Sequence, residues 1–162
     1  MPGSITFEPL GIGDLMRRSR HVVPPNQRSY AWEERNVRDL LQDLNGAIIR
    51  LVPAGITQEY FLGTIVLVEG KEGKPPNISD GQQRLATTSI VLARMRDLFR
   101  EMGDDARANA IETEYLFKTD VDTGEPKAQI GLNTLADNML YTEIDAVLER
   151  SERVLNGENL WH

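Results

Sequence analysis

A polar corner between two apolar stretches constrains the fold of this chain more than any other feature. Residues 77–79, Asn-Ile-Ser, are typical of the end of a short strand, Asp80-Gly81 is a turn pair, and Gln82 begins a run of good helix formers. Further along that run, four apolar residues have the spacing of one buried helical face: Leu85, Leu92, Met95 and Phe99. We therefore expect a strand at 77–80 to pass directly into a core helix at 82–101.

The corner has the composition of an anion-binding site. The N-terminus of a helix offers free backbone N–H groups and the positive end of the helix dipole. Arg84 adds a planar fork of donors suited to a phosphate, and Asp80 adds a carboxylate beside it. An alternative needs no ligand, because Asp-Gly before a helix is often only a capped turn, with Arg84 paired to Asp80 or to a neighbouring helix. The density of polar residues between two apolar elements favours the interpretation of the corner as a ligand-binding site.

A second polar segment precedes the first long helix. Val23-Pro24-Pro25 is expected to be extended, because paired prolines cannot continue a helix, and Gln27 and Arg28 follow in a polar loop. Tyr30 and Trp32 come next along the chain. These side chains are suited to lining a pocket for a nucleotide or a DNA backbone. Alternatively, the two aromatic rings anchor the following helix to the core.

The two segments together resemble a known family. Asp80-Gly81-Gln82-Gln83-Arg84-Leu85, with Val23-Pro24-Pro25 and the Gln-Arg-Ser-Tyr-Ala-Trp run at 27–32, resembles the N-terminal domain of GmrSD-type restriction proteins. This family is ParB/sulfiredoxin-like and includes the SspE effectors of phosphorothioate-based phage defence. The resemblance extends from Ile5 to about Ile144. It implies an α+β fold with a small mixed sheet packed by helices, and a single domain over 1–162 that is a fragment or short relative of a longer restriction protein.

The resemblance also implies a function. It indicates a regulatory domain of a DNA restriction system that binds and hydrolyses a nucleoside triphosphate, in a GTPase-like reaction with Mg²⁺, together with a DNA nuclease domain or subunit. Its DNA partner would include modified phage DNA. The corner 80–84 would cradle the phosphates, with Arg84 stabilising charge on the transferred group, Gln82 or Gln83 orienting water, and Asp80 holding the metal or acting as base. The other candidate phosphate-binding residues are Gly81, Gln27, Arg28 and Gly63.

Two alternatives to this function stay open. The chain has no Walker-type lysine loop that would support nucleotide hydrolysis independently of the resemblance. The same corner would also suit a module that binds the DNA backbone, or senses a DNA modification, without turnover. A scaffold for an active partner is the third possibility. The family commonly has tyrosine before Gln27-Arg28 and proline after it, whereas this chain has Asn26 and Ser29, so a sensing role tied to that ring is not carried over.

Charge is unevenly distributed along the chain. The net charge is −7, which argues against a surface that attracts nucleic acid over its whole extent. Between positions 17 and 38, however, six arginines are opposed only by Glu33 and Glu34. This segment predicts a local basic face for phosphates, or else a solvated helix end. The candidate DNA-binding residues are Arg17, Arg18, Arg20, Arg28, Tyr30 and Trp32.

The remaining patterns predict the other elements. The run at 60–68 is nearly all apolar and β-branched, which is typical of a strand buried on both faces, and Gly63 within it indicates a bulge or a close approach. An apolar stripe predicts a core helix at 33–51. With 21–24 and 77–80, the strand at 60–68 should form the centre of the sheet. Further strands are expected at 5–9 and 127–132, a loop or hairpin at 120–126, and helices at 12–18, 107–117, 133–141 and 142–155.

Residue types that are missing exclude several functions. The chain has no cysteine, which rules out disulfides, thiolate metal sites and the thiol chemistry of sulfiredoxin. His21 and His162 are the only histidines and lack partners at metal-ligand spacing, so a zinc or histidine-based nuclease centre is not expected. No signal pattern opens the chain, and no apolar run approaches the ~20 residues of a membrane span. These patterns predict a soluble, cytoplasmic protein without a membrane partner.

Overall fold

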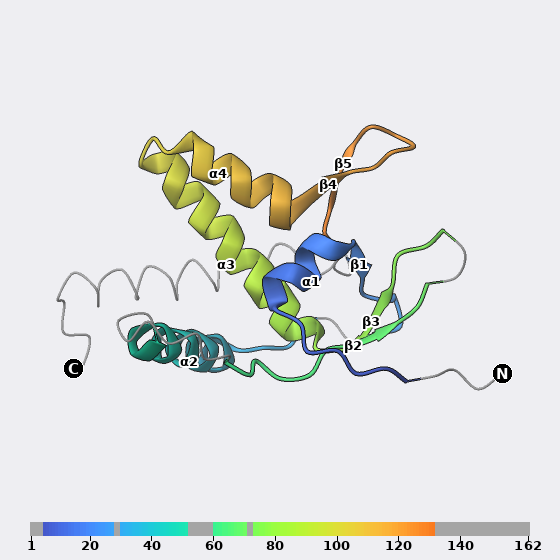
Figure 1. Ribbon diagram of the computed structural model, residues 1–162, viewed down its shortest axis with the longest axis horizontal. Coiled ribbons are helices and arrows are strands. Elements are labelled where there is room, and N and C mark those ends of the chain that lie inside the picture. Colours follow the sequence, from blue (N-terminus) through green and yellow to red (C-terminus); the bar gives the residue numbers. More distant parts are fainter. Residues whose placement is uncertain (1–4, 28–29, 52–59, 71–72, 132–162) are drawn as a thin grey trace.

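The centre of the fold is a small mixed sheet. The computed structural model describes residues 5–27, 30–51, 60–70 and 73–131, and Figure 1 shows their arrangement. Four strands of the described residues pair in the order β2 (Val66–Val68), β3 (Asn77–Asp80), β1 (His21–Val22) and β6 (Ile130–Gly131). β1 is parallel to both β3 and β6, whereas β2 is antiparallel to β3. The strands predicted at 21–24 and 77–80 are confirmed in the middle of this sheet.

Helices pack around the sheet and around one another. They are α1 (Ile12–Arg18), α2 (Glu34–Leu51), α3 (Gln82–Glu101), α4 (Asp105–Ile111) and a π-helical turn, η1 (Glu112–Leu116). In Figure 1, α3 leaves the sheet diagonally, and α4 returns from its far end. A hairpin of β4 (Phe117–Thr119) and β5 (Pro126–Ala128) projects from the body. The α+β class and the helices predicted at 12–18, 33–51, 82–101 and 107–117 are confirmed.

The core consists of two clusters that meet at α3. The first lies between the sheet, α1 and the start of α3, and contains Leu15, Met16, Val23, Ile78, Leu85 and Ile130. The second joins Val37 of α2 to Ala86 and Ile90 of α3, with Tyr30, Trp32 and Leu41 packed against it. Leu85 and Ala86 serve different clusters because neighbouring helical residues point about 100° apart. The first half of α3 is therefore buried on two sides.

The strand predicted at 60–68 is wrong in its length, its position and its burial. Only Val66–Val68 forms a strand, and all three of its residues are exposed. β2 lies at the edge of the sheet, because β3 pairs with the central β1 on its other side. Residues 60–65 have no regular structure, and Gly63 has a positive φ of 104° that no strand contains. Ile65 packs against the first core cluster instead.

Other predictions are corrected or lie outside the described residues. Residues 5–9 form no strand, and Phe7 is 89% exposed. The buried face of α3 includes Ile90 and Ala93 rather than Met95, which is 41% exposed, because the helix packs on two sides. The strand predicted at 127–132 is divided between β5, in the hairpin, and β6, in the main sheet. The helices predicted at 133–141 and 142–155 lie outside the described residues.

Candidate functional site

The site is built on the turn that joins β3 to α3. β3 ends at Asp80 and α3 begins at Gln82, so Gly81 alone makes the turn. Gly81 has a φ of 84°, in the left-handed region that favours glycine. A Cβ at this position would also lie 2.9 Å from Cγ1 of Ile65 and 3.1 Å from the carbonyl oxygen of Thr64. The corner therefore requires glycine, and no side chain at the N-cap covers the first turn of α3.

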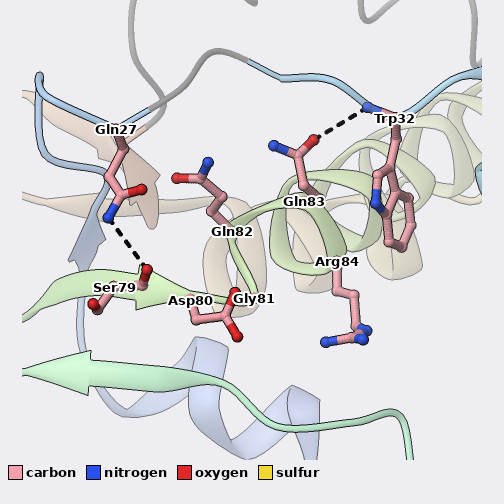
Figure 2. A pocket seen from close by; sticks show the side chains of 8 residues that line it. All are labelled: Gln27, Trp32, Ser79, Asp80, Gly81, Gln82, Gln83 and Arg84. Atoms are coloured by element: carbon pink, nitrogen blue, oxygen red, sulfur yellow. Dashed lines mark hydrogen bonds between the residues drawn. The ribbon is translucent and has the colours of Figure 1, made fainter.

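A pocket opens on this corner. It has a volume of about 200 Å³ and is lined by Gln27, Trp32, Ser79, Asp80, Gly81, Gln82, Gln83 and Arg84. Figure 2 shows that Gln82 and Gln83 point toward the segment that carries Gln27 and Trp32, whereas Asp80 and Arg84 point to the opposite side, where Arg84 meets Thr64 just before β2. The structure thus brings together the corner 80–84 and two residues of the second polar segment. Arg28 lies outside the described residues.

The two charged groups of the pocket are not paired with each other. Nη1 of Arg84 donates a hydrogen bond to the carbonyl oxygen of Thr64, at 3.3 Å. Among the described residues, neither Arg84 nor the exposed carboxylate of Asp80 forms an ion pair, which leaves the alternative of a purely structural Asp80–Arg84 bridge without support. A carboxylate and a guanidinium on one small pocket are therefore both accessible to a ligand.

Gln83 and Gln27 connect the corner to the second polar segment. Gln83 is buried, and its Oε1 accepts hydrogen bonds from the backbone N–H groups of Ala31, at 2.9 Å, and Trp32, at 3.3 Å. Nε2 of Gln27 donates to the carbonyl oxygen of Ser79 at 3.2 Å (Figure 2). These contacts hold residues on either side of 28–29 against the corner. The side-chain oxygen of Gln83 thus accepts hydrogen bonds from the backbone of the loop.

Tyr30 and Trp32 pack as anchors of the loop. The hydroxyl of Tyr30 lies 2.9 Å from Oγ1 of Thr87 on α3, and both aromatic rings pack against the second core cluster. This packing agrees with the alternative interpretation of the sequence, in which the two rings anchor the following helix to the core. Trp32 also lines the pocket, so its ring forms one wall of the candidate site.

The arginines of the N-terminal segment are engaged with acidic partners. Arg17 contacts Asp14 at 2.6 Å and Glu114 at 3.5 Å. Both guanidinium Nη atoms of Arg18 hydrogen-bond the carboxylate of Glu8 at 2.7 Å, which lowers the pKa of Glu8. Arg17 and Arg18 belong to the six arginines counted in residues 17–38. Carboxylates that the fold brings close to these two arginines therefore offset their positive charge.

Arg20 is also engaged and lies away from the corner. Its Nε donates to the carbonyl oxygen of Ala128 at 3.0 Å, beside β6. Arg17, Arg18 and Arg20 do not line the pocket. The structure thus separates these candidate DNA-binding residues from the corner, and their binding to DNA stays a prediction.

The sequence singled out Gly63, which lies beside Arg84 and does not line the pocket, but it gave no sign that Thr64 and Ile65 contribute to the site. Thr64 accepts a hydrogen bond from Arg84 with a backbone oxygen, and Ile65 fills the space beside Gly81. A backbone acceptor carries no signature in the sequence. The glycine at 63 was the one available signal, since a glycine within an apolar run indicates a close approach.

The described residues contain neither a metal-binding cluster of side chains nor a membrane-spanning helix. No group of three or more His, Asp or Glu side chains in the described part of the chain is arranged to hold a metal ion. No helix within these residues is both long and apolar enough to cross a membrane.

Comparison with known proteins identifies the family. Residues 12–158 match the family model described as the N-terminal domain of GmrSD restriction endonucleases. The chain belongs to this family. The match covers the corner 80–84 and the second polar segment, and it confirms the resemblance found in the sequence. A comparison with curated proteins gives no match. As a GmrSD N-terminal domain, the chain is a component of a DNA restriction system, a setting that implies interaction with DNA and nuclease function.

Proposed function

We propose that this GmrSD N-terminal domain binds a nucleoside triphosphate by its phosphates at the corner 80–84 and hydrolyses it, as a regulatory step in DNA restriction. The observation that carries the proposal is that the charges of Asp80 and Arg84 are not paired with each other. Both line one pocket at the start of a 20-residue helix, and neither forms an ion pair with a described residue. Because Asp80 and Arg84 do not neutralise each other, both charges stay accessible to a ligand in this pocket.

The size of the pocket supports phosphates as the part of the ligand that it holds. A volume of about 200 Å³ is below the roughly 300–1,000 Å³ of pockets that enclose a whole small molecule. The polyphosphate would occupy the corner, with the base and ribose outside it. The partial positive charge at the start of α3 and the guanidinium of Arg84 both favour an anion here.

The residues of the pocket also fit Mg²⁺ that arrives with the nucleotide. Mg²⁺ is commonly bound by one or two carboxylates together with substrate phosphates and water, and Asp80 is the one carboxylate that lines the pocket. Bound there, Mg²⁺ would neutralise charge on the phosphate oxygens. Asp80 would hold the ion or accept a proton from the attacking water. Gln82 would orient that water, and Arg84 would stabilise the charge that develops on the transferred group.

The test is phosphate release from each nucleoside triphosphate with Mg²⁺, in the presence and absence of modified DNA. Arg84→Ala should reduce turnover at least about tenfold, because a charge-assisted contact contributes roughly 1.5–3 kcal/mol. Arg35→Ala is the matched control, since its side chain is 87% exposed on α2 and does not line the pocket. An Arg84→Ala variant that hydrolyses nucleotide as fast as wild type would contradict the proposal.

A further inference from the structure

Residues 63–65 form a strap that passes beside the corner. Arg84 lies directly over Gly63, so that a Cβ built at this glycine would be 2.8 Å from Cζ and 3.0 Å from both Nη atoms of Arg84. The next residue, Thr64, accepts the hydrogen bond from Nη1. The guanidinium is thus held by a bare glycine Cα and an adjacent carbonyl oxygen. Any larger residue at 63 would displace the guanidinium, the end of a flexible side chain, from this position.

Among the described glycines with positive φ, this contact is unusual. The glycines with positive φ are Gly63, Gly73, Gly81, Gly103 and Gly124. At three of them, Gly73, Gly103 and Gly124, a Cβ would meet nothing within 4 Å, so the turn geometry alone accounts for glycine. Gly63 and Gly81 are crowded as well as turned, and each is crowded by the other's segment. The strap and the corner therefore fit together at two positions that lack a Cβ.

We infer that Gly63 is a positioning residue for Arg84. Its missing Cβ and the carbonyl oxygen of Thr64 form a seat that holds the guanidinium at the edge of the pocket. The seat uses Nη1, and the remaining donors of the planar fork stay available for phosphate oxygens. Gly63 thus acts through Arg84 and does not itself contact the phosphates. The part of this inference that concerns phosphates rests on the proposed function, whereas the seat is a property of the fold.

A stability cycle tests the seat without any ligand. Gly63→Ala, Arg84→Ala and the double variant are compared by urea unfolding, with Gly73→Ala as the control for an alanine at positive φ in open space. We expect Gly63→Ala to lower the urea midpoint more in the wild-type background than in the Arg84→Ala background, because removing the guanidinium removes the collision. An equal loss in both backgrounds would overturn the seat. If Gly63→Ala does not fold in either background, the strain of alanine at a φ of 104° accounts for it, and Arg84→Ala alone decides: a urea midpoint no lower than that of Arg35→Ala would overturn the seat.

A binding cycle tests whether the seat serves the ligand. Calorimetric titration with inorganic tripolyphosphate and Mg²⁺ should show at least about tenfold weaker binding for Gly63→Ala, the size of effect that losing one charge-assisted contact produces. In the Arg84→Ala background, the same substitution should change the affinity less than about twofold, because no guanidinium is left to displace. Equal weakening in both backgrounds would overturn the positioning role. If wild type and Arg84→Ala bind tripolyphosphate equally, the proposed function fails, and the stability cycle still decides the seat.

Discussion

The side-chain oxygen of Gln83 accepts a hydrogen bond from the backbone N–H of Ala31, 52 residues away along the chain. Gln83 is 6% exposed and Ala31 is exposed, so this is a part-buried contact between the first turn of α3 and the loop that carries Trp32. The pocket wall therefore depends on one glutamine that no ligand needs to touch.

Replacing Gln83 should loosen that wall. Gln83→Ala would leave the N–H groups of Ala31 and Trp32 without their acceptor, and a typical intramolecular hydrogen bond contributes about 0.5–1.5 kcal/mol to stability. The free energy of unfolding, measured with urea, should fall by that amount. Gln42→Ala, at an exposed position of α2, is the control. Equal stability of the two variants would show that the contact contributes nothing to the fold.

Asp80 should set the requirement for Mg²⁺. If Asp80 is the protein's ligand for the ion that accompanies the nucleotide, then Asp80→Asn removes the charge that attracts it. We expect the Mg²⁺ concentration for half-maximal turnover to rise about tenfold, in line with one charge-assisted contact. Asp43→Asn, exposed on α2, should leave it unchanged. A magnesium titration of phosphate release provides the measurement, and identical curves for the two variants would remove Asp80 from the metal site.

Arg18 should contribute little to DNA binding. Its guanidinium is held by the carboxylate of Glu8 through two hydrogen bonds, so its charge is already matched. Each phosphate contact contributes about 0.9 to the slope of log affinity against log salt. We expect Arg18→Ala to leave this slope for duplex DNA unchanged, as measured by fluorescence anisotropy. A slope smaller in magnitude by about one would instead show that Arg18 leaves Glu8 to contact a phosphate.

His21 should make the fold sensitive to mild acid. It is 1% exposed, and burial lowers its pKa below the ordinary value of 6.5. The unfolded chain therefore binds a proton at a higher pH than the folded chain, so stability should fall as the pH decreases from above 6.5 toward the lowered pKa of His21. Urea midpoints at several values across this range would measure the loss, and His21→Gln should reduce it.

A separate acid transition should follow at lower pH. Hydrogen bonding from Lys127 lowers the pKa of Asp120 from 3.8 to about 2, and this stabilisation is lost as the pH falls through that range. Asp120 titrates at and below 3.8, so it does not contribute to a loss near neutral pH, which can be assigned to the histidine. A His21→Gln variant with the full wild-type loss near neutral pH would contradict the assignment.

The sequence predicted those parts of the site that depend on local chemistry. Asp80-Gly81 marks a turn, the residues after it favour a helix, and this information is contained in a short window. The burial of 60–68 could not be read in the same way, because an apolar β-branched run looks alike at the centre and at the edge of a sheet. Only the pairing of β3 with β1 decides that β2 is an edge strand.

Contacts between distant segments account for the remaining differences. Arg17 meets Glu114, 97 residues later in the chain, so a count of charges along residues 17–38 could not include this partner. Likewise, the side-chain oxygen of Gln83 is used by a loop whose position depends on the packing of Tyr30 and Trp32. The polar groups that remain accessible to a ligand can be identified only in the folded structure, where the hydrogen bonds within the protein are known.

The burial of α3 on two sides has a mechanical consequence. A helix held by Leu85 in one cluster and by Ala86 and Ile90 in the other cannot turn about its axis without opening one of them. Its 20 residues span roughly 30 Å and end where α4 begins to fold back. A displacement of the first turn of α3 would therefore also move its other end, where α4 begins. That end lies far from the pocket where phosphate chemistry would take place.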